Sequence, residues 1–154
     1  MSKYWLLKTE PTTFGLDELK RAPKQTSCWD GVRNYQARNF IREMAVGDLA
    51  FLYYSSCDTP GIVGIVGVVR AAYPDHTAFD STHKHYDADS KSDAPRWFMM
   101  DVKLERALKR LISLDELRKH ADGKLADMRI LQRGNRLSVT PVSAAHWRFI
   151  LSLE

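Results

Sequence analysis

The sequence predicts an α+β fold, a compact barrel-like sheet of five or six β-strands surrounded by short helices. Two observations lead to this fold class. β-rich runs are mixed with short helical segments, and the regular strand–helix alternation of a doubly wound sheet is absent. The chain of 154 residues suits one hydrophobic core, and neither a linker nor an internal repeat divides it. We therefore expect a single domain over residues 1–154.

The first half of the chain is predicted to supply most of the strands and two helices. Four β-rich runs are expected to be strands: 3–9, 26–29, 49–55 and 61–73. The last two are separated by a turn at Pro60 and Gly61, which favours an antiparallel pair. A short helix is expected between the turn at Pro11 and Pro23, and a second one begins at residue 35. Asn34 precedes this second helix and can cap its first turn.

The second half is predicted to hold one long strand and three helices. Residues 74–95 are polar and irregular, whereas residues 96–108 alternate partly and indicate a long strand. Three later segments have helical spacing: 113–120, 125–133 and 142–151. We expect these helices to pack around the sheet.

Composition points to anionic partners and to the cytoplasm. The 23 Lys and Arg residues outnumber the 19 Asp and Glu residues, which gives a net charge of +4 and an isoelectric point near 9.1. No signal sequence is recognisable, and no stretch approaches the about 18 apolar residues of a membrane span, so no membrane partner is expected. Cys28 and Cys57 lack metal-ligand spacing and are expected to be reduced thiols.

Motifs for cofactors, metals or catalysis are weak. Residues 61–69, "GIVGIVGVV", have three-residue glycine spacing rather than a dinucleotide fingerprint, and they indicate a buried strand. Alternating His83, His85, Asp87 and Asp89 could chelate a metal, but such residues in a polar loop are usually solvated. The sequence therefore predicts no catalytic residue, no cofactor and no metal site.

Aromatic residues next to polar groups are the more informative feature. Seven of them come from separate predicted elements: Trp5, Trp29, Tyr35, Tyr53, Tyr54, Trp97 and Trp147. A nucleic-acid base offers two faces for stacking and an edge for hydrogen bonds, and its phosphate attracts Arg or Lys. The same rings would equally fill the core of a small barrel. Periodicity does not separate a base pocket from a core.

Seven segments resemble, in order, the motifs of the EVE domain family of the PUA-like superfamily, which is related to YTH domains. They are "YWLLKTEP" at 4–11, "WDGVRNYQARN" at 29–39, "GD" at 47–48, "YYSS" at 53–56, "GIVGIVGVV" at 61–69, "PRW" at 95–97 and "RLSVTPV" at 136–142. Thr9 stands where Ser is typical of the family, which retains the hydroxyl. The resemblance covers nearly the whole chain and implies one EVE domain with a PUA-like mixed β-barrel.

The resemblance implies a nucleic-acid-binding module, not an enzyme, that reads a modified cytosine or adenine in DNA. Trp29 and Trp97 would be opposite walls of an aromatic pocket, and Arg38 and Arg42 would contact phosphates. The motifs carry over these base-pocket residues: Lys8, Glu10, Trp29, Val32, Arg33, Asn34, Tyr54, Ser55, Ser56, Trp97 and Ser138. The expected partner is DNA or RNA with a modified base, and the expected oligomeric state is a monomer.

Two alternatives remain open at this stage. One is an RNA-binding PUA-like module that acts on tRNA or rRNA and uses the 2′-hydroxyl. The other is a small nuclease or hydrolase of the ASCH type, for which Glu10 is the one acidic candidate for a general base.

Overall fold

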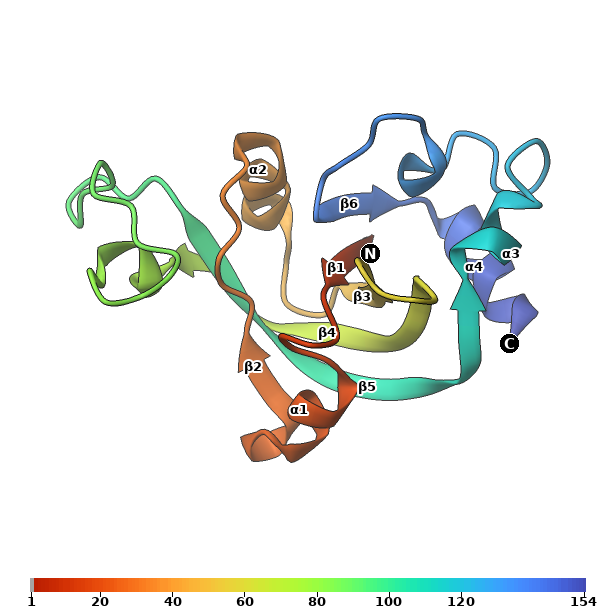
Figure 1. Cartoon of the computed structure of the whole chain (residues 1–154), viewed down its shortest axis with the longest axis horizontal. Helices are drawn as coiled ribbons and strands as arrows, with labels where there is room; N and C mark the ends of the chain where they lie inside the picture. The colour runs from red at the N-terminus through yellow and green to blue at the C-terminus, as the bar shows by residue number, and fades with distance from the viewer. Residues whose placement is uncertain (1) are drawn as a thin grey trace.

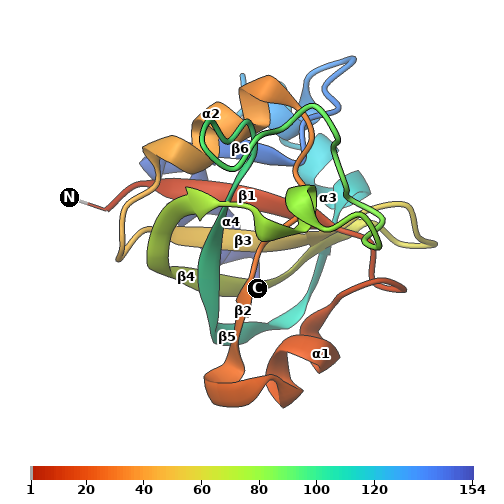
Figure 2. The same ribbon diagram turned by 90° about the vertical axis from the view of Figure 1, so that its left-hand side faces the viewer.

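One curved, six-stranded mixed sheet forms the centre of the molecule, in a computed structural model that describes residues 2–154 (Figures 1 and 2). The strand order is β2-β5-β4-β3-β1-β6, and only β1 and β3 pair in parallel. The strands are β1 (Tyr4–Thr9), β2 (Thr26–Cys28), β3 (Leu49–Tyr54), β4 (Gly61–Pro74), β5 (Phe98–Ser113) and β6 (Val139–Val142). This arrangement confirms the predicted α+β class with six strands.

Four α-helices and three 3₁₀ turns surround the sheet. The helices are α1 (Leu16–Arg21), α2 (Tyr35–Glu43), α3 (Leu114–Arg118) and α4 (Ala144–Leu153), and the 3₁₀ turns are η1 (Pro23–Gln25), η2 (His76–Phe79) and η3 (Arg129–Leu131). No helix within residues 2–154 is long and apolar enough to cross a membrane.

The sheet separates two hydrophobic clusters. Side chains alternate along a strand, so Trp5 and Leu7 of β1 enter the first cluster, whereas Leu6 enters the second. Helix α2 covers the first cluster with Ile41, and α4 covers the second with Trp147. Register shifts between β4 and β5, at several points along 14- and 16-residue strands, accompany the curl of the sheet.

Most predicted elements are confirmed, and the segment at 125–133 is the main correction. That segment contains only the single 3₁₀ turn η3. Asp127 has a left-handed φ of 65°, and Met128 and Gln132 are extended with ψ of 128° and 138°, so no α-helix can run through it. Strand β6 was not foreseen; it is a four-residue edge strand that contains Pro141. The long strand β5 runs five residues further than the predicted 96–108.

The predicted cap of α2 is confirmed. The backbone N–H of Ala37 donates to Oδ1 of Asn34 at 3.0 Å. This bond fixes the point at which the chain from β2 enters the helix.

Replacing Asn34 by alanine is expected to lower the free energy of unfolding by about 1 kcal/mol, because an amide of the first turn loses its acceptor. Asn34→Asp retains the acceptor and is expected to keep most of the stability. Chemical denaturation of both variants measures the difference. Gln36→Ala, an exposed change on the same helix, is the control and should stay within about 0.5 kcal/mol of the unsubstituted protein. Equal losses for Asn34→Ala and Gln36→Ala would contradict the role of the cap.

Candidate nucleic-acid interface

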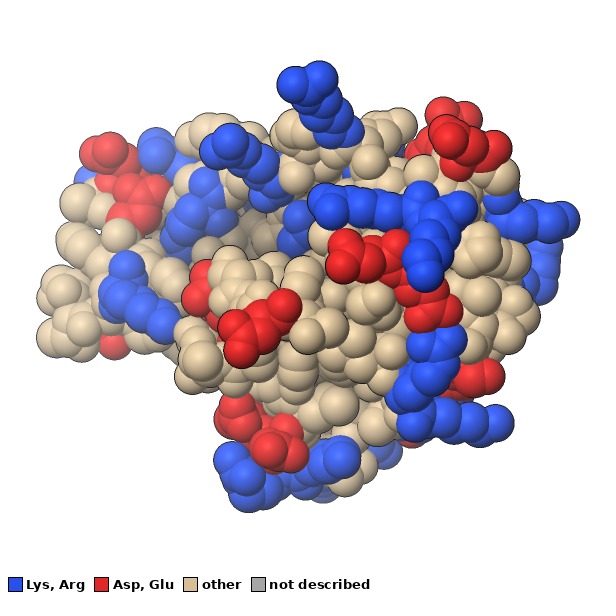
Figure 3. Space-filling model, turned by 45° about the vertical axis from the view of Figure 1, so that its right-hand side comes forward, with Lys and Arg blue, Asp and Glu red and all other residues tan. Residues whose placement is uncertain are grey.

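Two hollows flank the segment that leads into α2. The first has a volume of about 540 Å³ and lies among the end of β1, the chain between β2 and α2, the loop after η2 and the start of β6. Its lining residues are Lys8, Thr9, Glu10, Thr13, Phe14, Ser27, Cys28, Trp29, Asp30, Gly31, Val32, His83, Lys84, His85 and Ser138. The space-filling view shows a hollow on this side of the molecule, with basic side chains above it and acidic ones below (Figure 3).

Two aromatic rings form a corner of the first hollow. The rings of Phe14 and Trp29 meet at 87° with their centroids 6.0 Å apart. Trp29 is only 7% exposed and also belongs to the first hydrophobic cluster, so the hollow is continuous with the core. The Thr9 hydroxyl donates to the carbonyl of Phe14 at 2.9 Å, and the N–H of Trp29 donates to the carbonyl of Met100 at 2.7 Å. These two bonds hold the backbone at Phe14 and Trp29 in place.

A buried carboxylate holds the segment between β2 and α2 in place. Asp75 is fully buried and accepts hydrogen bonds from the N–H of Gly31 at 2.8 Å, from Arg33 at 3.0 Å and from the N–H and hydroxyl of Thr77. Burial raises the pKa of Asp75, but the hydrogen bonds from Thr77, Gly31 and Arg33 outweigh it and hold the pKa below its usual value. Arg33 also donates to the carbonyl of His85 at 2.7 and 3.1 Å. Asp75 and Arg33 together join two walls of the first hollow.

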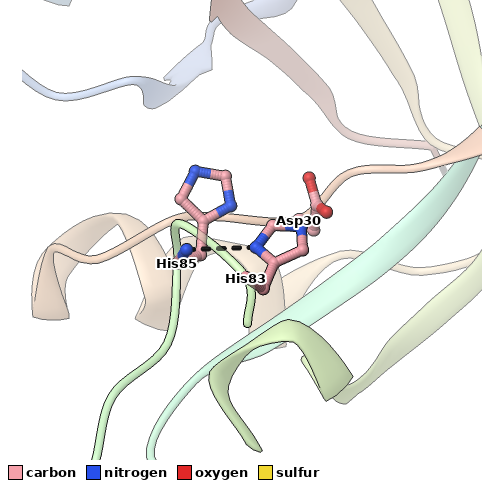
Figure 4. Close-up of side chains that lie close together, drawn as sticks. All are labelled: Asp30, His83 and His85. Atoms are coloured by element: carbon pink, nitrogen blue, oxygen red, sulfur yellow. Dashed lines mark hydrogen bonds between the residues drawn. The ribbon is translucent and has the colours of Figure 1, made fainter. Parts of the chain in front are cut away.

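Asp30, His83 and His85 gather at the rim of the first hollow (Figure 4). One oxygen or nitrogen atom from each side chain lies within 4.8 Å of the others. The N–H of His85 donates to Nδ1 of His83 at 3.0 Å. The ring of His85 lies against Gly31, where a Cβ atom would come within 2.3 Å of it. Burial lowers the pKa of His85, which favours the neutral imidazole at pH 7.

The two histidines of this cluster differ in their hydrogen bonds. A metal-bound histidine normally donates its second ring N–H to an acceptor. Nδ1 of His83 instead accepts a backbone N–H, and Nδ1 of His85 is buried without a partner within residues 2–154. Coordination through Nε2 of His83 would place a proton on its Nδ1 and break this hydrogen bond, whereas Nδ1 of His85 can accept a hydrogen bond from a ligand or bind a cation.

The structure distributes the base-pocket residues expected from the sequence among three places. Lys8, Glu10, Trp29, Val32 and Ser138 line the first hollow. Asn34 lines the second. The others lie outside the lining of both hollows: Arg33, Tyr54, Ser55, Ser56 and Trp97.

Trp97 lies behind Arg33 and outside both hollows. Its ring stacks on Tyr35 with centroids 4.9 Å apart, its indole N–H donates to Asp87 at 2.6 Å, and the guanidinium of Arg33 lies 5.5 Å from its ring centroid. The ring thus supports the residue that joins the two walls. It does not face Trp29 across the first hollow.

The "YYSS" segment forms hydrogen bonds with the chain segments that line the first hollow. The hydroxyl of Tyr54 accepts the N–H of Leu16 at 2.8 Å, and the N–H of Ser55 donates to the carbonyl of Thr9 at 2.9 Å. Ser56 has a left-handed φ of 54° at the turn that follows. These contacts position the chain around Phe14.

The two arginines of α2 are engaged in local contacts. Arg38 donates to the side chain of Asn39 and to the carbonyl of Arg96, and its guanidinium lies 5.0 Å from the Tyr35 ring. Arg42 lies over Phe98. Neither arginine lines a hollow.

Sequence reasoning missed several lining residues. Phe14, Asp30, His83, Lys84 and His85 line the first hollow. Asp30 lies inside the "WDGVRN" segment, so its place in that segment was an available signal. Phe14 carries no local signal. In the sequence, the alternating histidines of the 83–85 loop indicate only possible metal ligands, because only the tertiary fold brings that loop to the hollow.

The second hollow, of about 410 Å³, has a different chemistry. It is lined by Asn34, Gln36, Arg129, Gln132, Arg133, Gly134, Asn135, Arg136 and Leu137. Three arginines and no acidic residue are among these, whereas the first hollow has Lys8 and Lys84 beside Glu10 and Asp30.

The curved mixed sheet with an aromatic hollow at the ends of its strands defines a PUA-like domain. The chain belongs to the EVE domain family, whose profile matches residues 3–153. Thymocyte nuclear protein 1 of Danio rerio is 50% identical over 165 residues, which cover 97% of this chain and 71% of the relative.

Solved structures share the fold. The human THYN1 protein, solved in complex with 5-methylcytosine containing DNA, has a TM-score of 0.95 at 46% identity, covering 99% of this chain and 97% of that one. The YTH domain of the Zygosaccharomyces rouxii MRB1 protein, solved with N6-methyladenosine RNA, has a TM-score of 0.55 at 14% identity, covering 99% of this chain and 83% of that one. The second similarity concerns the fold alone.

Proposed function

We propose that this protein binds DNA and reads a modified base, with 5-methylcytosine the leading candidate, by holding the base in the first hollow. The observation that carries the proposal is the hollow itself, where the Phe14 and Trp29 rings lie beside hydrogen-bonding side chains. A protein 46% identical to this chain has been solved with 5-methylcytosine containing DNA, which supports the choice of base.

The lining of the first hollow suits the chemistry of cytosine. The Asp30 and Glu10 carboxylates can accept from an exocyclic amine, and the Lys8 ammonium can donate to a ring carbonyl. The volume of about 540 Å³ lies within the range of small-molecule sites. The base has to leave the helical stack to enter, or be single-stranded.

The 5-methyl group is expected to add a modest preference. Burying one methyl group contributes about 0.8 kcal/mol, which corresponds to a ratio of about fourfold between 5-methylcytosine and cytosine. In this proposal the protein is a reader that leaves its ligand unchanged.

Titrations of matched oligonucleotides test the proposal. Fluorescence anisotropy with DNA that carries cytosine, 5-methylcytosine or N6-methyladenine, and with RNA of the same sequence, should show the strongest binding for 5-methylcytosine in DNA. Asp30→Asn is expected to weaken binding about tenfold to a hundredfold, because a hydrogen bond to a charged acceptor contributes about 1.5–3 kcal/mol. Asp93→Asn, an exposed change outside both hollows, is the control.

Three outcomes would contradict the proposed function. Equal affinities for DNA with cytosine and DNA with 5-methylcytosine would show that the protein does not recognise the methyl group. Tighter binding of the RNA oligomer would favour the RNA-binding alternative. Cleavage or chemical change of a labelled oligonucleotide, with or without divalent metal, would favour an enzyme.

A further inference from the structure

We propose that the second hollow is a phosphodiester-binding site that holds the backbone of the nucleic-acid strand beside the base in the first hollow. This inference rests on the proposed function for the strand's position, but the affinity of the second hollow for phosphates can be tested without it. The strongest observation is the set of three arginines around the hollow, none of which pairs with a carboxylate within residues 2–154, although Arg129 lies 5.6 Å from the Phe40 ring centroid.

Three exposed guanidinium groups border the second hollow, those of Arg129, Arg133 and Arg136. Within residues 2–154, none of them pairs with a carboxylate, whereas Arg106 and Arg110 on β5 are bound to Glu154 and Glu116. Guanidinium groups bind phosphate oxygens through two parallel N–H bonds. Three of them beside one concavity, without an acidic neighbour in its lining, suit a polyanion.

The loop that carries these arginines has a defined internal structure. The side chain of Asn135 donates to the carbonyl of Arg129 and accepts the N–H of Leu137 at 2.9 Å. The N–H of Asn135 donates to the carbonyl of Gln132 at 3.2 Å. Gly134 has a φ of 80°, the left-handed conformation that glycine adopts without strain. These bonds close the loop from residue 129 to 137, which carries all three arginines of the hollow.

The N-terminus of helix α2 adds a positive electrostatic potential to the second hollow. Its N-cap residue Asn34 and its second residue Gln36 line the hollow, so the helix N-terminus opens there. The positive end of a helix dipole favours anions. The first turn of α2 contains no acidic residue, whereas Asp17 and Glu18 occupy that turn in α1. The nine-residue helix and the arginines therefore act in the same direction.

The two hollows adjoin along two segments of the chain. Val32 lines the first hollow and Asn34 lines the second; Ser138 lines the first and Leu137 the second. A nucleic-acid strand that places one base in the first hollow therefore passes beside the second hollow, because the lining residues of the two hollows are one or two positions apart in the sequence. The mixed charge of the first hollow suits a base edge, and the basic second hollow suits the backbone that follows.

The double variant Arg133→Ala/Arg136→Ala is expected to weaken binding of DNA with 5-methylcytosine and with cytosine by the same factor, about tenfold or more. The slope of log affinity against log salt should become shallower by about 0.7–0.9 for each lost phosphate contact. Lys119→Ala/Arg148→Ala, two exposed basic residues outside both hollows, removes the same two positive charges and is the control. Circular dichroism checks that all variants remain folded.

The nucleoside 5-methyl-2′-deoxycytidine, which has no phosphate, separates the two proposals. It should bind the Arg133→Ala/Arg136→Ala variant as well as the unsubstituted protein. The phosphodiester site is overturned if this variant binds DNA with the same affinity and salt slope as Lys119→Ala/Arg148→Ala, or if it alters the ratio between modified and unmodified DNA. The proposed function fails instead if the unsubstituted protein has no preference for the modified base, whatever the arginine variants do.

Discussion

Asp75→Ala is expected to lower the free energy of unfolding by about 3–5 kcal/mol, because it leaves the half-buried Arg33 and the amides of Gly31 and Thr77 without their acceptor. Chemical denaturation measures the loss. Asp93→Ala, an exposed carboxylate, is the control and should stay within about 0.5 kcal/mol of the unsubstituted protein. A loss below about 1 kcal/mol for Asp75→Ala would show that the segment between β2 and α2 is held by other contacts.

The contribution of Asp75 also has a defined pH dependence. Its pKa is lowered in the folded protein, so the stabilisation is fully present above the unfolded pKa of about 3.9 and is lost as the pH falls through the lower folded pKa. The stability difference between the unsubstituted protein and Asp75→Asn should therefore narrow only under acid conditions. If this stability difference changed between pH 6 and 8 instead, the titrating group would be a histidine and not Asp75.

Phe14→Ala is expected to weaken binding of DNA with 5-methylcytosine by about fivefold to a hundredfold, because stacking on an aromatic ring contributes about 1–3 kcal/mol per base. Phe14 is half-buried at the edge of the first hydrophobic cluster, so the protein should remain folded. Anisotropy titration beside thermal unfolding measures both effects.

Two tryptophan variants complete this comparison. Trp29→Ala should reduce both binding and stability, since Trp29 is part of the first hydrophobic cluster as well as the first hollow, and the loss of a buried Trp costs about 3–5 kcal/mol. Trp147→Ala, in the second cluster, should reduce stability alone in any variant that remains folded. If Phe14→Ala retains full affinity, the aromatic corner is not where the base stacks.

Local patterns in the sequence predicted the elements that depend on local chemistry. The cap at Asn34 and the β-rich runs are visible because each is a property of a few consecutive residues. Strand β6 is short, contains Pro141 and exists because β1 offers it an edge, which no local pattern records. The turn at Asp127 likewise depends on a single backbone angle.

The hollows were harder to predict than the elements because they depend on distant partners. Arg33 reaches the carbonyl of His85, 52 residues away, and thereby brings the 83–85 loop to Asp30. The aromatic residues illustrate the same limit. Trp29 lies next to Asp30 and Trp97 next to Arg96, yet one tryptophan lines the first hollow and the other stacks on Tyr35 outside it.

The position of β1 between β3 and the edge strand β6 affects how the chain acquires its shape during synthesis. β1 is flanked by β3 and by β6, and the N–H of Lys8 donates to the carbonyl of Ser138 at 2.9 Å. A ribosome needs on the order of ten seconds to add the residues between these two positions. During that time β1 lacks one neighbour, and an unpaired strand edge is open to contacts with other nascent chains. Since Lys8 and Ser138 both line the first hollow, the binding surface is completed only when this last strand is in place.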